Sequence, residues 1–540
     1  MEGFVPIPEE AARRYRSDAL WSLYETIPSL LVDAARDFGD RDAVVDDSGR
    51  RLTYGELEDQ SARLAGALEA RGIGPGDVVG VQLPNRVEAS LVACAIERLG
   101  AIVNPLVTVY RERELEYMCA KCETKALVVP GTFRRFDHEA LALHVAERVP
   151  SLTTIVTLDD DPPPGTDSLA ALLAEGSRAA ARDIDPDAFA AVLFTSGTEA
   201  DPKGVLHTHN TLLANCRAIA TLLDMDEDDA VFMASPVGHG TGYGFGIRLA
   251  LHLGGKLVLQ ETWNAAEAAT LIAEERCAYT HASMPFAHDL LNVPGLGDRD
   301  LSCLRYFVTG GASVPSGFVT RIREHVGCLL LRLYGQTEAF MTTLNRPADL
   351  VETLESRDGA PVPSVEMQIW DDDGNEVPTG TPGEAVCRGA HRCVGFIRDE
   401  ERARRSITVD GWLRMGDYCT MDEHGYVTVV GRKKEVINRG GYKYSPREVE
   451  DLVAVHADVD RVAVVRMDDE RLGEKACIFV IPKSGATPTL ETLVAYLREH
   501  GVAAYKWPER LELVDALPMT ASGKVQKFVL EEQLRAAVRA

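Results

Sequence analysis

Hydrophobic and polar residues alternate with two different periods between residues 52 and 126. Leu57, Leu64 and Leu68 recur at helical spacing, whereas residues 78–83 form a short, mostly apolar run of strand length. The same two kinds of segment recur downstream, helix-like at 89–99 and strand-like at 101–105. Alternation of this kind predicts a parallel sheet that is covered by helices on both faces.

The last hundred residues repeat the alternation on a smaller scale. Apolar spacing predicts helices at 448–455 and 490–500 and strands at 462–466 and 476–481. Ahead of them, turn-rich stretches at 371–374 and 378–384 lie between short β-like runs. The pattern therefore predicts a β-rich region that is followed by a compact α/β tail.

A turn rich in threonine, serine and glycine follows the apolar run at 189–194. It reads Thr195-Ser-Gly-Thr-Glu-Ala-Asp-Pro-Lys-Gly204. Glycine lets main-chain amides approach phosphate oxygens, the hydroxyls donate hydrogen bonds, and Lys203 adds a fixed charge. Because Lys203 precedes Gly204, the segment is not a Walker loop. We interpret it as a loop that wraps a polyphosphate; the alternative is an ordinary surface turn.

The length and the acidic net charge of the chain exclude some classes of protein. The chain has 540 residues and a formal net charge of −26, which argues against non-specific binding of nucleic acid and against docking on anionic membranes. No apolar run approaches the roughly 20 residues needed to span a bilayer. The amino terminus lacks the basic-then-apolar order of a signal peptide. We expect a cytoplasmic protein with more than one domain.

Cysteine and histidine spacing gives no strong metal signal. The eleven cysteines are scattered, and Cys119 and Cys122 form an isolated Cys-x-x-Cys without the four ligands that structural zinc requires. His207 and His209 are two residues apart, which is a weak spacing for metal ligands. We interpret the cysteines as reduced thiols and these two histidines as structural.

Several motifs, in chain order, resemble those of the adenylate-forming superfamily, which includes acyl-CoA synthetases, free-standing adenylation enzymes and beetle-type luciferases. They are the loop at 195–204, the glycine-rich segment at 236–246, Tyr334-Gly-Gln-Thr-Glu338, Trp412-Leu-Arg-Met-Gly-Asp417, Gly431-Arg-Lys-Lys434 and Ser522-Gly-Lys524. The loop departs from the family pattern at Glu199 and Ala200. Glu199 matters because a carboxylate beside a triphosphate repels it unless it points away or meets a cation.

The resemblance implies the fold class and the domain organisation. It implies an α/β fold with a large amino-terminal domain of doubly wound mixed sheets plus a β-subdomain, and a small mobile α+β carboxy-terminal domain. The expected boundaries are an amino-terminal domain at 1–431, a hinge at 432–434 that contains Lys434, and a carboxy-terminal domain at 435–540.

The resemblance also implies which residues bind ATP and Mg²⁺. Tyr334 would pack on adenine, Thr337 would touch the α-phosphate and Glu338 would help to hold Mg²⁺. Asp417 would accept both ribose hydroxyls, and Arg432 would also reach the ribose. The expected nucleotide-binding residues are Thr195, Ser196, Gly197, Thr198, Gly311, Ala312, Tyr334, Gly335, Gln336, Asp417 and Arg432. The expected catalytic residues are Lys203, Thr337, Glu338 and Lys524.

Glycine occupies every even position from 238 to 246. Each glycine costs about 0.5–1 kcal/mol in a regular element, which a sequence tolerates where something must approach the backbone. By the resemblance, this region lines the acyl pocket with His239 and Tyr243, joined by Gly310; a hydrogen-bonded structural role is the alternative for His239. Small residues at Val237 and Gly238 suggest a roomy pocket for a bulky acid.

A second pair of glycines, Gly440 and Gly441, is expected to bind CoA together with Tyr442. By the resemblance, the pantetheine arm passes here during thioester formation, and bare glycine fits the close passage of a thin chain. The small domain would turn about the hinge, so that Lys524 leaves the site and Gly441 reaches it.

The leading hypothesis is an acyl-CoA ligase. ATP and Mg²⁺ would convert a bulky alicyclic, aryl or polycyclic acid to acyl-AMP with release of pyrophosphate, and CoA would then take the acyl group as a thioester. The alternatives are a free-standing enzyme that loads a carrier protein, a thiolation-dominant variant that uses supplied acyl-AMP because of Glu199, a luciferase-like oxygenase, and a non-catalytic nucleotide sensor. The expected partners are the acid, ATP and CoA, without nucleic acid or membrane, and a homodimer is one possible assembly.

Overall fold

The computed structural model describes residues 3–195, 202–310, 314–315, 317–439, 442–519 and 525–539. Its contacts divide the chain into two compact units. The first comprises Met1–Thr195, Asp201–Met367 and Cys387–Leu413, and the second comprises Gln368–Val386 and Arg414–Ala540. We describe each unit by itself. The expected boundary at residue 431 does not coincide with this division and stays a prediction.

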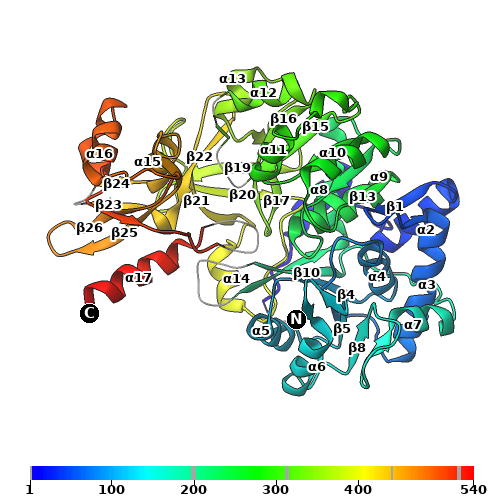
Figure 1. The fold of residues 1–540 in the computed structure, drawn as a ribbon. Coiled ribbons are helices and arrows are strands. Elements are labelled where there is room, and N and C mark those ends of the chain that lie inside the picture. Colours follow the sequence, from blue (N-terminus) through cyan, green and yellow to red (C-terminus); the bar gives the residue numbers. More distant parts are fainter. Residues whose placement is uncertain are drawn as a thin grey trace. The chain divides into compact units, whose positions relative to one another are not determined.

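The first unit contains two large sheets (Figure 1). Among the described residues, one sheet has the order β11-β10-β4-β3-β5-β8-β9 and the other the order β18-β17-β16-β15-β14-β12-β13-β1-β2. The strands of the first are β3 Val78–Val81, β4 Ile102–Pro105, β5 Ala126–Val129, β8 Thr154–Thr157, β9 Asp167–Ser168, β10 Phe189–Thr195 and β11 Lys203–Thr208. The strands of the second are β1 Asp42–Asp46, β2 Arg51–Thr53, β12 Ala230–Met233, β13 Leu257–Leu259, β14 Cys277–His281, β15 Tyr306–Gly310, β16 Leu329–Gln336, β17 Phe340–Leu344 and β18 Ala360–Pro361.

Helices cover both sheets and separate them. The elements are α1 Glu9–Ser17, α2 Ile27–Phe38, α3 Tyr54–Ala70, α4 Val87–Arg98, α5 Glu112–Cys122, the hairpin strands β6 Thr132–Phe133 and β7 Phe136–Asp137, α6 His138–Arg148, α7 Leu169–Glu175, α8 His209–Leu223, α9 Leu249–Leu253, α10 Ala265–Glu274, α11 Met284–Leu291, the short η2 Leu296–Asp298, α12 Phe318–His325, α13 Val351–Ser356 and α14 Glu400–Ser406. Every residue of α4 is buried, because this helix packs on β3 and β4 of one sheet and on β1 of the other. Helices α5 and α6 cover the opposite face of the seven-stranded sheet (Figure 1).

A buried ion pair connects α4 to the glycine-rich segment. Residues Thr241–Arg248 form a π-helix, η1, which leads directly into α9. Arg248 at its end donates to Glu97 of α4 at 2.9 Å, and both side chains are fully buried. A buried charge is costly unless it is paired, so this contact fixes the π-helix against α4.

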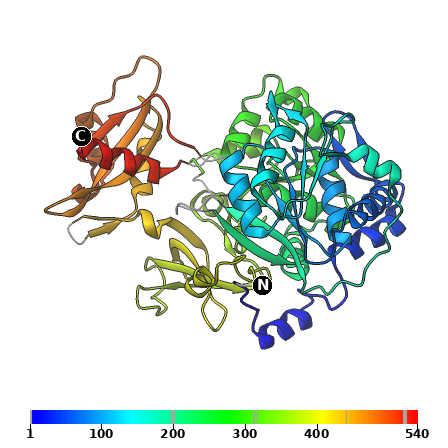
Figure 2. The same cartoon turned by 90° about the horizontal axis from the view of Figure 1, so that it is seen from below.

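The second unit contains a four-stranded sheet and a smaller α/β layer. The elements are β19 Val365–Trp370, β20 Gly383–Gly389, β21 Leu413–Met421, β22 Val427–Arg432, η3 Lys433–Glu435, β23 Ile437–Arg439, β24 Tyr442–Tyr444, α15 Pro446–Val453, β25 Val459–Asp469, β26 Gly473–Pro482, α16 Leu490–Glu499, η4 Ala504–Lys506, β27 Arg510–Leu513 and α17 Lys527–Arg539. Helices α15 and α16 pack on one face of β25 and β26, and α17 lies across the other face (Figure 2).

The predicted α/β class is confirmed. The alternation of helices and strands at the amino end follows the expected order, from α3 through β3 and α4 to β4. One local feature differs from the simple strand-and-turn interpretation of the phosphate loop. Residues Lys203–Thr208 form strand β11, which pairs antiparallel with β10, so a hairpin flanks the loop. No helix among the described residues is both long and apolar enough to cross a membrane.

Candidate functional site

Strands β14, β15 and β16 run parallel and end at one edge of their sheet. In parallel sheets, ligands bind at the carboxyl ends of the strands. His281 ends β14, Gly310 ends β15 and Gln336 ends β16. The predicted Tyr334–Glu338 motif therefore lies at the edge where a ligand is expected.

Lys203 and Glu338 face each other across the two sheets of the first unit. Lys203 begins β11 and donates from its Nζ to a carboxylate oxygen of Glu338, which follows β16. The Glu338 side chain is only 4% exposed and the Lys203 side chain 22%. Nearby along the chain, the Oγ1 atom of Thr195 is buried and has no hydrogen-bond partner among the described residues. This end of the sheet thus offers the buried carboxylate of Glu338, the ammonium group of Lys203 and the Thr195 hydroxyl, which has no partner among the described residues.

The chain reverses sharply around Glu338. The Ala339 amide donates to the Gln336 carbonyl at 2.9 Å, and Phe340 has a positive φ of 42°. At Gly335 a Cβ atom would lie 1.7 Å from the Phe340 carbonyl oxygen, so a side chain cannot fit. The glycine of the Tyr334–Glu338 motif therefore permits the close approach of β16 and β17 at this end.

Glycine in the segment 238–246 serves close packing within the protein. A Cβ atom would come closer than 3.0 Å to neighbouring atoms at Gly238, Gly242, Gly244 and Gly246. At Gly240 the nearest atom is Thr337 Oγ1, at 3.8 Å. Among these glycines, which the structure describes in full, Gly240 is the one that leaves room beside the Thr337 side chain.

The two predicted acyl-pocket side chains of this segment lie in different surroundings. His239 is half-buried, and its Nδ1 accepts a hydrogen bond from the Thr241 amide at 3.2 Å. Tyr243 is fully buried and donates its hydroxyl to Glu97 at 2.9 Å. Burial raises the pKa of Tyr243 well above its usual value. Tyr243 therefore joins the buried contact between η1 and α4.

Three further side chains at this edge escaped the sequence analysis. The His281 ring packs on the Phe245 ring with centroids 4.3 Å apart, and its buried Nδ1 has no hydrogen-bond partner among the described residues. Phe245 also packs edge-to-face on Phe340, at 5.8 Å. Burial lowers the pKa of His281 to about 3, so the ring is neutral. The position of His281 at the end of β14 was the sequence feature that could have identified it as a site residue.

His207, interpreted as structural, also contacts the motif. Its Nε2 lies 2.8 Å from the Thr337 carbonyl oxygen, and its ring packs on Phe340 with centroids 4.8 Å apart. Burial lowers the pKa of His207 to about 4. His209 is buried too, but its Nδ1 accepts from the Ile27 amide at 3.3 Å. The two neighbouring histidines therefore serve different parts of the fold.

The second unit brings together the two residues expected at the ribose. Asp417 of β21 and Arg432 of β22 are directly paired in the antiparallel ladder. Arg432 Nε lies 3.0 Å from an Asp417 carboxylate oxygen. The Asp417 side chain is 7% exposed, whereas that of Arg432 is 42% exposed. One carboxylate and one accessible guanidinium are thus held side by side.

Lys434 of the predicted hinge and Tyr442 of the predicted CoA site are exposed. Lys434 lies in the short 3₁₀ helix η3 and is exposed. Tyr442 begins β24 with 65% of its surface exposed, and its ring lies 5.2 Å from that of Tyr505. Their roles stay predictions.

Several predicted site residues lie outside the described residues. They are Ser196, Gly197, Thr198, Gly311, Ala312, Gly440, Gly441 and Lys524, together with the atypical Glu199. Gly310, which is described, lies at the end of β15, where a Cβ atom would come within 2.7 Å of the Leu333 carbonyl oxygen.

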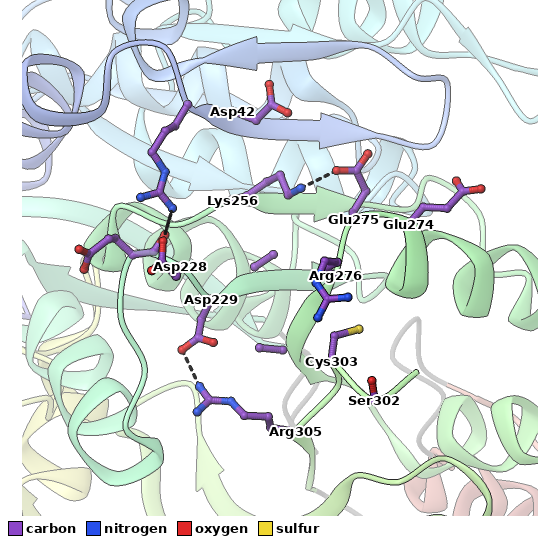
Figure 3. A pocket seen from close by; sticks show the side chains of 14 residues that line it. Asp42, Asp228, Asp229, Lys256, Glu274, Glu275, Arg276, Ser302, Cys303 and Arg305 are labelled. Carbon is purple, nitrogen blue, oxygen red and sulfur yellow. Dashed lines mark hydrogen bonds and ion pairs between the residues drawn. The ribbon is translucent and has the colours of Figure 1, made fainter. Parts of the chain in front are cut away.

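The opposite edge of the same sheet contains an open pocket of about 600 Å³ (Figure 3). Its lining residues precede the strands: Asp229, Lys256, Arg276 and Arg305 come before β12, β13, β14 and β15. Arg305 pairs with Asp229 at 2.5 Å, and Lys256 pairs with Glu275 at 2.6 Å. Two of the cations that line this pocket are thus already paired with carboxylates. A candidate metal group among the described residues, Glu112, Glu116 and His144, lies on α5 and α6.

Comparison with known proteins gives matches over most of the chain. A family model described as AMP-binding enzyme matches residues 31–396, and one described as AMP-binding enzyme C-terminal domain matches residues 448–524. The chain is 36% identical to the medium-chain fatty-acid–CoA ligase of Escherichia coli, over 97% of this chain and 93% of that protein. It is 34% identical to a salicylyl-CoA synthase/salicylate adenylyltransferase of a Streptomyces species, over 99% and 98% of the two chains.

A solved structure extends the comparison to a bound nucleotide. The structure of ATP-bound MatB from Rhodopseudomonas palustris has a TM-score of 0.84 and 27% identity, and the match covers 95% of this chain and 100% of that one. The family models together span most of the sequence, including the motifs at 195–204, 236–246, 334–338 and 522–524. The chain therefore belongs to the AMP-binding, adenylate-forming enzyme family.

Proposed function

We propose that this protein is an ATP-dependent acyl-CoA ligase that works through an acyl-AMP intermediate. In the first step, a carboxylate oxygen of the acid attacks the α-phosphorus of ATP, and pyrophosphate leaves. In the second step, the thiol sulfur of CoA attacks the acyl carbonyl carbon, and AMP leaves with the electron pair of the broken C–O bond. The single observation that carries the proposal is the Lys203–Glu338 contact at the carboxyl edge of the sheet.

The first step brings two anions together, so the site must supply positive charge. Lys203 is only partly exposed and its ammonium group stabilises charge that develops between the acid and the phosphates. In this proposal the Thr337 hydroxyl, which lies next to Gly240, donates to the α-phosphate. Positioning of this kind provides much of the catalysis in phosphoryl-type transfer.

The residues present fit Mg²⁺. Glu338 offers a buried carboxylate, and Thr195 offers a buried hydroxyl oxygen without a partner among the described residues. Oxygen ligands of this type, completed by phosphate oxygens and water, suit Mg²⁺. When bound, the ion neutralises phosphate charge; Glu338 would hold it, and Lys203 would then be released toward the phosphates.

The nucleotide sugar is assigned to the second unit. A carboxylate is a natural acceptor for two neighbouring hydroxyl groups, and the Asp417 carboxylate is fixed by Arg432 at 3.0 Å. In this proposal Asp417 accepts from the ribose hydroxyls and Arg432 also contacts the sugar. Tyr334, which is 7% exposed, packs on the adenine.

Lys524 is proposed to act in the first step only, with a turn of the small domain about Lys434 separating the steps. Replacement of Lys524 by alanine should slow adenylation by about 10²–10³, the loss expected for one transition-state donor. Thioester formation from supplied acyl-AMP should hardly change. Equal losses in both half-reactions would refute this division of labour.

The acid is proposed to be bulky: alicyclic, aryl or polycyclic. A relative that acts on salicylate supports an aryl acid, whereas the fatty-acid ligase shows that a similar chain accepts a different class. The space beside Gly240 and the apolar rings of Phe245 and Phe340 are the local features that would contact the acyl group. Gly310 and His239 complete the proposed pocket.

CoA is the proposed acceptor, with Gly440, Gly441 and Tyr442 on its path. A carrier protein is the alternative acceptor. A thiolation-dominant variant, caused by Glu199, is the second alternative. We also propose that the protein works in the cytoplasm, and a homodimer is compatible with the proposal.

The test is a panel of carboxylic acids with ATP, Mg²⁺ and CoA, in which pyrophosphate and thioester are measured together. The expected result is stoichiometric release of both with one class of bulky acid. Pyrophosphate without thioester, followed by acylation of a carrier protein, would favour the first alternative. Thioester only from supplied acyl-AMP would favour the second, and neither product with any acid would refute the ligase.

A further inference from the structure

The peptide groups of Thr337 and Glu338 are held by two separate hydrogen bonds. The Thr337 carbonyl accepts from His207 Nε2 at 2.8 Å, and the Glu338 carbonyl accepts from the Cys393 amide at 2.7 Å. Both carbonyls belong to the sharp reversal between β16 and β17, whose few internal bonds include Ala339 to Gln336. The orientation of two proposed ATP-contacting residues therefore depends on contacts from outside the reversal.

Strand β11 supplies one of these contacts and also the lysine. Alternate residues of a strand point to the same face, so Lys203, Val205 and His207 share one face of β11. The opposite face carries Leu206, which packs into the apolar core below the seven-stranded sheet. One rigid strand thus presents Lys203 to the Glu338 carboxylate and His207 to the neighbouring backbone.

The hydrogen bonds of His207 define a single tautomer. A carbonyl oxygen can only accept, so Nε2 carries the proton and Nδ1 is an acceptor. Nδ1 lies 3.1 Å from the Thr211 hydroxyl, whose single proton can be donated to Nδ1 or to the Thr208 carbonyl. The ring is fully buried and packs against Phe340, the residue with positive φ that completes the reversal. Both ring nitrogens and one ring face are therefore in use.

We propose that His207 is a positioning residue for the adenylation step: by donating to the Thr337 carbonyl, it fixes the Thr337–Glu338 peptide in register with Lys203 of the same strand. This inference rests on the proposed function for its kinetic consequence. Its structural content, that the side chain at position 207 orders the reversal, can be tested without turnover. His207 itself contacts no reacting atom.

The kinetic experiment compares His207→Leu with His207→Gln. Leucine fills the space but cannot donate, whereas the glutamine amide can still donate to the Thr337 carbonyl. Loss of one hydrogen bond of about 1–1.5 kcal/mol predicts a roughly tenfold lower kcat for acid-dependent ATP–pyrophosphate exchange in His207→Leu. The KM for the acid and the thiolation of supplied acyl-AMP should be unchanged. His207→Gln should recover most of the lost rate.

Hydrogen exchange supplies the second measurement. In the full-length protein without substrates, the amides of Ala339 and Met341 should exchange faster in His207→Leu than in the wild type, and near the wild-type rate in His207→Gln. His209→Gln is the matched control, because His209 is equally buried but bonds to Ile27. It should leave exchange at Ala339 and kcat per folded molecule unchanged.

The outcomes distinguish the ordering of the reversal by His207 from its effect on adenylation. Equal exchange and equal kcat in wild type and His207→Leu would overturn the positioning role, and so would equal defects in the Leu and Gln variants. If the wild-type protein formed no acyl-AMP, the proposed function would fail. Faster exchange only in His207→Leu would then still support the structural part, and unchanged exchange would overturn it.

Discussion

Two lysine–glutamate pairs lie at opposite edges of the first unit. At the amino edge of the nine-stranded sheet, Glu275 binds both Lys256, at 2.6 Å, and Arg51, at 3.1 Å. At the carboxyl edge, the described residues give Glu338 a single cationic partner, Lys203. The Glu338 side chain is also the more buried, with 4% exposed against 15% for Glu275.

The difference shows that pocket size alone does not mark a site. The amino edge has a cavity of about 600 Å³, but two of its cations, Arg305 and Lys256, are already paired with Asp229 and Glu275. The carboxyl edge has fewer charges, and several buried polar atoms near it, such as His281 Nδ1 and Thr195 Oγ1, have no partner among the described residues. Unused hydrogen-bonding groups and a buried carboxylate with a single described cationic partner are what an anionic ligand and its cation would engage.

The largest expected effect comes from removing the lysine at each edge in turn and comparing the rates of adenylation. Lys203→Ala should slow adenylation by about 10²–10³, because one preorganised positive charge is lost. Lys256→Ala, the matched variant at the amino edge, should keep the wild-type rate. Pyrophosphate release under saturating ATP is the measurement. A comparable loss in both variants would mean that the edges do not differ in function.

Packing at the carboxyl edge predicts the next largest effect. In Gly244→Ala, the new Cβ would lie 2.5 Å from the Phe340 ring, and such overpacking should lower the free energy of unfolding by up to about 3 kcal/mol. Gly240→Ala has its nearest neighbour at 3.8 Å and serves as the control. Urea unfolding measures both, and equal stability of the two variants would contradict the observed packing.

The buried histidine His281 predicts a pH effect on stability. Burial lowers its pKa in the folded protein to about 3, below the unfolded value of 6.5, so the unfolded chain binds more protons at pH 5. Stability that is present above pH 6.5 is therefore lost as the pH falls, by about 2 kcal/mol at pH 5 for one such group. His281→Gln should show a correspondingly smaller loss between pH 7.5 and 5 in urea unfolding. Parallel losses would argue against a neutral buried ring.

The smallest effect is expected at the amino edge. The Lys256–Glu275 contact is partly exposed, and pairs of this kind contribute about 1 kcal/mol or less. Lys256→Ala should therefore lower the free energy of unfolding only slightly, and less still in 1 M salt. Thermal unfolding at two salt concentrations checks this. A loss of several kcal/mol would show that the amino edge depends on its charges more than its exposure suggests.

The sequence was sufficient for the parts of the site that depend on motif identity. Lys203 and Glu338, which are 135 residues apart, were both predicted as site residues and lie in contact. Asp417 and Arg432 were also predicted and are paired. His207 was interpreted as structural, and its contact with the Thr337 backbone was not predicted, because no local pattern reveals a carbonyl partner 130 residues away.

The amino-acid sequence by itself determined the alternation of elements and the family, since periodicity and short motifs are local properties. Tertiary structure alone decided what the glycines at 238–246 do. Most of them admit neighbouring backbone or rings, and only the pairing of distant segments creates those contacts. It likewise decided that Tyr243 bonds to Glu97, whereas the Thr337 side chain lies next to Gly240, because burial and partner choice arise when separate strands and helices pack together.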